Sequence, residues 1–169
     1  MHFWITLIKA GNSEFILRKF NNAINFYQQA LKQCQIMFSE HVEENADEAI
    51  AIMIISYCNI ADTKLERNEI QAACLEYEKA FQFISTLQKM STNAEILEAS
   101  FKASSQLHRQ WFDCLKRYEH QLKNVAFLNG KTTRLFGKYS HPNSVLSYLN
   151  IKNKKFPIYE NNNNLSEQH

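Results

Sequence analysis

One apolar pattern occurs twice in this chain, and its two copies lie fifty residues apart. The first copy, residues 7–31, reads LIKAGNSEFILRKFNNAINFYQQAL, and the second, residues 57–81, reads YCNIADTKLERNEIQAACLEYEKAF. In each copy, apolar residues recur every three or four positions on both sides of a short polar break, which is the spacing of amphipathic helices. The repeat therefore predicts two helix-turn-helix units and indicates a scaffold that binds other molecules.

Helix breakers are scarce in most of the chain. Its three Gly and two Pro include only one, Gly11, before residue 130. We therefore predict an all-α fold, an antiparallel helix-turn-helix array of five to six helices. The periodicity predicts helices over about residues 3–18, 21–45, 45–67, 70–90 and 92–126, the last either continuous or bent. The candidate N-caps are Asn21 or Asn22, Asn45, Asn68 and Thr92.

Small residues recur at matching places in the two copies. Gly11 lies inside the first predicted helix, where glycine costs roughly 1 kcal/mol relative to alanine. A glycine at such a position indicates the close approach of another backbone. Alanines occupy the other matching positions, namely Ala23, Ala30, Ala61, Ala73 and Ala80. We expect helices to cross closely at these residues, with aromatic side chains filling the gaps between them.

The sequence divides into a helical domain, residues 1–128, and a basic, Asn-rich and largely irregular C-terminal tail, residues 129–169. Residues 127–169 hold six Lys/Arg against two acids, whereas the preceding residues hold thirteen against fifteen. Basic residues interleaved with aromatic ones suit single-stranded nucleic acid. The charge is dilute, however, so a solubilising tail or one that folds back is the stronger interpretation. A small helical regulator that binds nucleic acid through this tail is the alternative function.

The four cysteines, Cys34, Cys58, Cys74 and Cys114, lie far apart within helical patterns, and no CxxC occurs. We interpret them as small buried apolar residues in a reducing compartment. No apolar run approaches the roughly 20 residues of a membrane span, and the first residues lack the pattern of a signal peptide. We therefore expect a cytoplasmic protein without membrane association.

No enzyme signature is present in the sequence. It contains no GxSxG, no HExxH, no glycine-rich phosphate loop and no paired-cysteine motif. His108 and His120 share one predicted helix at a spacing too wide for one metal ion, and His108 reads as a core or groove residue. We therefore predict a protein that is not an enzyme, with no cofactor and no metal site.

The two copies resemble the tetratricopeptide repeat, a pair of antiparallel helices about 34 residues long. The matching positions of the first copy are Leu7, Ala10-Gly11, Phe15, Phe20, Ala23, Tyr27 and Ala30-Leu31. Those of the second are Tyr57, Ile60-Ala61, Leu65, Ile70, Ala73, Tyr77 and Ala80-Phe81. The proline that normally ends each unit is absent, and Gln35 stands in its place. The second helix can then run on, which explains the longer spacing. The layout is similar to that of small bacterial tetratricopeptide proteins of unassigned function.

The resemblance implies a protein–protein interaction module that binds a peptide or a helix in a groove lined by its first and third helices. The residues implied are Ile5, Ile8, Asn12, Phe15, Ile16, Ile55, Cys58, Asp62, Leu65 and Glu66. Asn12 and Asp62 hold equivalent places and can bond an extended peptide backbone. This lining contains no Lys or Arg to clamp a C-terminal carboxylate, so an apolar or helical ligand fits better.

Two alternatives remain for this apolar lining. Two repeats cannot cover their own concave surface, and arrays of this kind need a third unit or a capping helix. We expect the stripe from Phe101 to Tyr118 to pack on the fourth helix and complete the array. The rest of the lining then binds a partner protein or a second copy of the chain, or else it is covered and idle. A homodimer formed through this lining is therefore a candidate oligomeric state.

Overall fold

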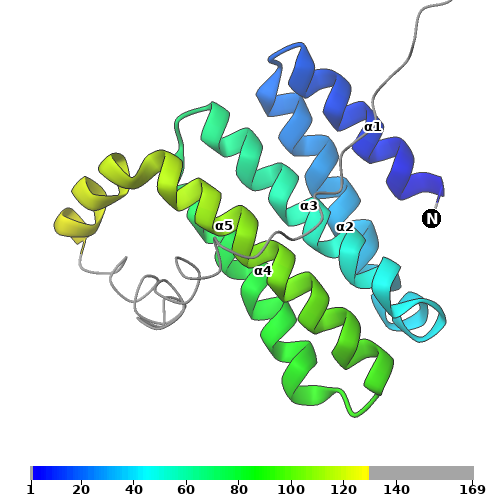
Figure 1. Cartoon of the computed structure of the whole chain (residues 1–169). Coiled ribbons are helices and arrows are strands. Elements are labelled where there is room, and N and C mark those ends of the chain that lie inside the picture. Colours follow the sequence, from blue (N-terminus) through cyan, green and yellow to red (C-terminus); the bar gives the residue numbers. More distant parts are fainter. Residues whose placement is uncertain (1, 130–169) are drawn as a thin grey trace, which may run out of the picture. The chain divides into compact units, whose positions relative to one another are not determined.

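In the computed structural model, the residues described are 2–129, and they form five α-helices and no strand. The helices are α1 (His2–Ile16), α2 (Phe20–Glu44), α3 (Ala46–Glu66), α4 (Ile70–Met90) and α5 (Ala94–Asn129) (Figure 1). The predicted all-α class is confirmed. α5 is one long helix that bends at Tyr118, where φ is −110° and ψ is 17°. The predicted tail, residues 129–169, lies outside the described residues except for Asn129, the last residue of α5.

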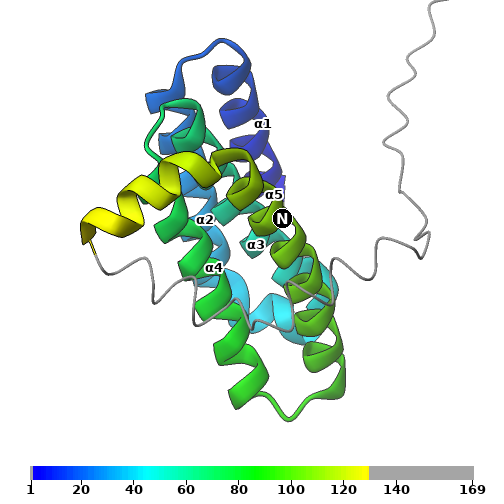
Figure 2. The same cartoon turned by 60° about the vertical axis from the view of Figure 1, so that its left-hand side comes forward.

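The helices form an antiparallel array. Each packs against the next along the chain, and α5 also packs against α3. Figures 1 and 2 show α1, α3 and α5 on one side of the array, with α2 and α4 on the other. α3 lies in the middle and is buried along most of its length, as its largely apolar first half predicts. Alternate helices of the chain therefore share one face, and residues far apart in sequence meet on it.

The fifty-residue repeat is visible in the backbone of the two turns. Arg18 and Asn68 both adopt a left-handed conformation, with φ of 57° and 60°. In the first turn, Arg18 N–H donates to Phe15 O (2.9 Å) and Lys19 N–H donates to Glu14 O (2.8 Å). The second turn repeats both bonds at residues fifty positions later, with lengths of 2.8 and 2.9 Å. Both helices thus end in a Schellman motif, which satisfies their last carbonyls without glycine.

The small residues do pack where the repeat predicts. Ala23, Ala30, Ala73 and Ala80 are fully buried. Gly11 differs from the prediction in what approaches it, because its neighbour is a side chain and not a backbone. A Cβ atom added to Gly11 would lie 2.4 Å from Cε1 of the Tyr27 ring. The absence of a side chain at Gly11 therefore makes room for an aromatic ring from α2.

The predicted N-caps are right at one helix and wrong at three. α4 begins at Ile70, and its N-cap is Glu69 and not Asn68. Asn45 caps α3 as predicted, because its side chain accepts a hydrogen bond from Glu48 N–H at 3.1 Å. α5 is capped by Asn93 and not by Thr92, since Asn93 Oδ1 accepts from Glu95 N–H at 2.9 Å. α2 begins at Phe20, before either predicted asparagine, and its N-cap Lys19 makes no side-chain cap bond. The Schellman turn fixes the start of α2 instead.

α5 completes the array, in agreement with the prediction, but not with every predicted residue. Leu107, Trp111 and Cys114 are buried. The Trp111 ring lies 5.1 Å from that of Tyr77, and the His108 ring lies 4.7 Å from that of Phe81. These contacts join α5 to α4. Phe101 is 60% exposed, so its assignment to the packed stripe was wrong.

Candidate partner-binding groove

Two hollows lie between α3 and α5 on the face shared by α1, α3 and α5. Each has a volume of about 350 Å³. The first is lined by Asn45, Asp47, Glu48, Ala51, Ile54, Ile55, Ala99, Lys102, Ala103, Gln106 and Gln110. The second is lined by Phe15, Asp62, Leu65, Glu66, Tyr77, Gln110, Asp113, Cys114 and Arg117. Because both include Gln110, we treat them as two ends of one groove, the apolar end and the acidic end.

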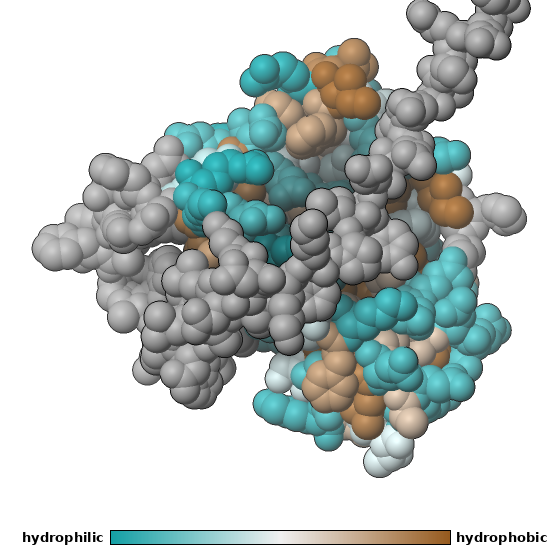
Figure 3. Space-filling model, viewed as in Figure 1, coloured by the Kyte–Doolittle hydropathy of each residue, from teal (hydrophilic) through white to brown (hydrophobic). Residues whose placement is uncertain are grey.

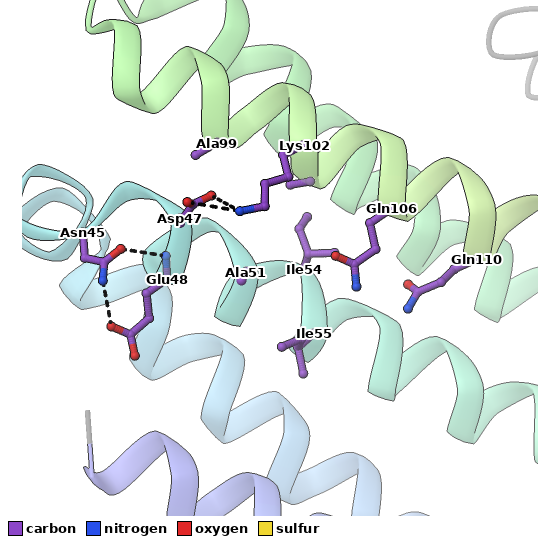
Figure 4. A pocket seen from close by; sticks show the side chains of 11 residues that line it. Asn45, Asp47, Glu48, Ala51, Ile54, Ile55, Ala99, Lys102, Gln106 and Gln110 are labelled. Atoms are coloured by element: carbon purple, nitrogen blue, oxygen red, sulfur yellow. Dashed lines mark hydrogen bonds and ion pairs between the residues drawn. The ribbon is translucent and has the colours of Figure 1, made fainter. Parts of the chain in front are cut away.

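The apolar end has a floor of aliphatic side chains and a polar rim (Figure 4). Ala51, Ile54 and Ile55 of α3 face Ala99 and Ala103 of α5. At the rim, Lys102 Nζ lies 3.2 Å from Asp47 Oδ1, an exposed ion pair that bridges the two helices. Such exposed pairs contribute little stability. This end therefore combines an aliphatic floor with a charged and polar rim.

Two glutamines of α5 lie over the middle of the groove, and Figure 4 shows both side chains between α5 and α3. Gln110 Oε1 accepts a hydrogen bond from the Cys58 thiol, with an Sγ–Oε1 distance of 2.9 Å. The amide N–H groups of Gln110 form no hydrogen bond with the described residues, and neither does the side chain of Gln106. These groups are able to bond a ligand.

Three carboxylates and one guanidinium line the acidic end, namely Asp62, Glu66, Asp113 and Arg117. Asp62 Oδ1 accepts a hydrogen bond from Tyr77 Oη at 3.1 Å. Surrounding protein atoms desolvate the carboxylate and raise the pKa of Asp62, Glu66 raises it further, and the Tyr77 hydrogen bond and Arg117 act in the opposite direction. The charge of Asp62 is thus incompletely compensated by its neighbours.

The equivalent residues Asn12 and Asp62 have the same partner in each repeat. Tyr27 Oη donates to Asn12 Oδ1 at 2.7 Å, as Tyr77 Oη donates to Asp62 Oδ1 in the second repeat. In both cases a tyrosine from the second helix of the unit is tied to the first helix. These two side chains therefore already hold an internal bond, although both residues are exposed and have further acceptor capacity.

The ten predicted groove residues fall into three groups. Those exposed are Ile5, Asn12, Ile16, Ile55, Asp62 and Glu66. Ile8 and Phe15 are half-buried and pack against the core cluster of Ala23, Tyr27 and Ile60. Cys58 and Leu65 are buried, so their prediction as open contact residues was wrong, although Leu65 still forms part of a wall. Of the ten, Phe15, Ile55, Asp62, Leu65 and Glu66 line the two hollows.

The groove residues that sequence reasoning missed come from the start of α3, from Tyr77 of α4 and, as one polar stripe, from α5. Gln106, Gln110, Asp113 and Arg117 follow one another at steps of three or four residues, so they share one helix face. This polar stripe runs beside the buried stripe of Leu107, Trp111 and Cys114. The signal was present in the sequence, but it reads as an ordinary solvated face until α5 is placed against α3.

The described residues contain no group of three His, Cys, Asp or Glu side chains placed to hold a metal ion. All four cysteines are free and buried, as predicted. Burial raises the pKa of the Cys58 and Cys114 thiols to about 12, so neither is a thiolate at neutral pH.

Exposed apolar side chains are distributed over the surface of the described region. Figure 3 shows hydrophilic areas over much of the visible face, with smaller hydrophobic areas between them. Ile5 and Ile55, which are fifty residues apart, are 37% and 39% exposed. Within residues 2–129, no helix is both long and apolar enough to cross a membrane.

The described residues form an all-α array of five helices with a partly acidic groove on one face. The chain belongs to a family described as protein of unknown function DUF2753, whose match covers residues 2–129. The matched region coincides with the five helices. No curated protein and no solved structure matches the chain.

Proposed function

We propose that the chain is a non-enzymatic protein–protein interaction module of tetratricopeptide type, which binds a segment of a partner protein in the groove between α3 and α5. One observation carries the proposal: α3 and α5, two helices that are distant in sequence, line one groove with both polar and apolar side chains. Its floor is apolar, its rim is polar, and two glutamine side chains offer hydrogen bonds over its middle. Binding sites commonly combine these features.

The repeat supports the same proposal. Equivalent turns, equivalent tyrosine bonds and equivalent alanines recur at a spacing of fifty residues, as in a helical repeat array. Such arrays use the face formed by their alternate helices to hold extended partners. The nucleic-acid alternative depends on the basic tail, which lies outside the described residues.

Site-specific photo-crosslinking tests the proposal. A photoreactive phenylalanine analogue is introduced at Ile55 in the full chain, and a matched variant carries it at Leu75, an exposed apolar residue of α4 outside both hollows. We expect a discrete protein crosslink from position 55 that is absent from position 75. A crosslink to a second copy would identify a homodimer. Equal crosslinking at both positions, or none at 55, would contradict a partner site in the groove.

A further inference from the structure

We infer that the groove selects a basic, extended segment of its partner protein, one that places lysine or arginine side chains in the acidic end and an apolar side chain in the apolar end. This inference rests on the proposed function and specifies its ligand. It differs from the ligand expected from the sequence, which was apolar or helical. The difference comes from the acidic end, where α5 contributes charge that the predicted lining lacked.

The acidic end carries an excess of negative charge that its own residues do not neutralise. Asp62, Glu66 and Asp113 face a single cation, Arg117. Within residues 3–118, whose side chains are described, neither Glu66 nor Asp113 forms an ion pair. Like charges gathered in one hollow repel one another, and a cationic ligand relieves that repulsion. Charge complementarity therefore selects a basic partner over an acidic or neutral one.

Comparison of the two repeats indicates that the charge of Asp62 is not needed for folding. Asn12 has the same place in the first repeat, and its neutral amide oxygen accepts the Tyr27 hydroxyl at 2.7 Å. The bond from Tyr77 to Asp62 is longer, at 3.1 Å. The bond to the tyrosine therefore does not require a carboxylate. The negative charge at residue 62 is then available to a cation that enters the hollow.

The spacing of the glutamines favours an extended ligand. Gln106 and Gln110 are four residues apart on α5, which places them about 6 Å apart along the helix axis. An extended chain presents equivalent backbone groups every two residues, or about 6.6 Å. Both amides can therefore bond successive backbone groups on one edge of such a segment. The side chains of the ligand then point into the two ends of the groove.

Selection from a random-sequence peptide library displayed on phage, with the full chain as bait, tests this inference. Selected peptides are synthesised, and their affinities are measured by fluorescence anisotropy. The test variant is the triple substitution Asp62→Asn, Glu66→Gln and Asp113→Asn. The matched control removes three exposed acids outside the groove, Glu40→Gln, Glu43→Gln and Glu98→Gln. Far-UV circular dichroism and thermal melting establish that both variants fold.

We expect selected peptides to be enriched in lysine and arginine with at least one large apolar residue. The groove variant should weaken their binding about tenfold, and the control should not change it. Neutral or acidic peptides whose binding depends on Ile55, tested as Ile55→Ser, would overturn the inference and leave the proposed function standing. A different outcome is that the selection yields no basic peptides while sedimentation shows a dimer that Ile55→Ser dissociates. A second copy of the chain would then be the occupant of the groove, and the inference would be overturned. Peptides that bind independently of both Ile55 and the three acids would contradict the inference and the proposed function together.

Discussion

The contact between Gly11 and the Tyr27 ring predicts that Gly11→Ala will destabilise the protein when the ring is present and stabilise it when the ring is absent. A Cβ atom at position 11 would lie 2.4 Å from Cε1 and 2.7 Å from Cδ1 of Tyr27, whereas carbon atoms pack at about 3.5–4.0 Å. The ring is buried and its hydroxyl is bonded to Asn12, so it cannot move away freely. Overpacking of this kind costs about 1–3 kcal/mol. Replacing glycine with alanine inside a helix gains about 1 kcal/mol.

Gly11→Ala should therefore lower the free energy of unfolding by about 0–2 kcal/mol, despite the better helix propensity of alanine. In a Tyr27→Leu background the ring is absent, and the same substitution should stabilise the protein by about 1 kcal/mol. The two substitutions form a double-mutant cycle. Urea unfolding followed by far-UV circular dichroism measures all four free energies.

One result would contradict this prediction. If Gly11→Ala stabilised the chain that retains Tyr27 by the full gain in helix propensity, the ring would not lie over Gly11. The second repeat offers a control, because Ala61 already occupies the place that corresponds to Gly11 and is buried. Ala61→Gly should destabilise the protein, because it lowers helix propensity and can leave a small cavity.

Four further predictions concern charge, packing and the thiols. Burial alone would raise the pKa of Glu76, but its bonds to Lys64 (2.6 Å) and Lys79 (3.0 Å) outweigh burial and lower the pKa. The free energy of unfolding should therefore fall as acidification protonates Glu76. Glu76→Gln should remove this pH dependence. The pKa of Asp62 is raised, so its effect on stability has the opposite pH dependence: the folded state loses stability as pH rises above the ordinary pKa of an aspartate. Asp62→Asn should therefore stabilise the protein at neutral pH and lose that advantage in acid. Urea titrations at several pH values will measure both effects. Ala80→Leu should cost about 1–3 kcal/mol by overpacking, whereas Ala94→Leu, at an exposed position, should cost much less; equal losses would contradict the close crossing. Burial raises the pKa of the Cys34 and Cys74 thiols to about 11, so a thiol-specific reagent at mildly alkaline pH should label the cysteines only on unfolding, and rapid labelling of the native chain would refute their burial.

The repeat made much of the fold predictable. Ala23 and Ala73, like Ala30 and Ala80, are small because helices cross there, and a spacing of fifty residues carries that constraint from one unit to the next. Helix periodicity also located all five helices to within a few residues. The starts of α2 and α5 were less predictable, because several adjacent Asn and Thr residues are equally able to cap a helix and only the local turn selects one.

The groove was less predictable than the fold. Periodicity identifies which residues share a helix face, but the exposure of that face depends on how the helices cross. Leu65 and Cys58 lie on the predicted face of α3 and are nevertheless buried, because Tyr77 and α5 lie over that side. Asp113 and Arg117 read as surface charges in the sequence and become lining residues only once α5 packs on α3.

Hydrogen–deuterium exchange of the full chain, with and without the partner recovered by crosslinking from position 55, tests the central claim most directly. Binding in the groove should slow exchange on the facing parts of α3 and α5, namely residues 51–66 and 99–117. The exposed side of α4, which includes Leu75, should exchange at an unchanged rate. Protection confined to α2 and α4, with α3 and α5 unaffected, would contradict a partner-binding groove.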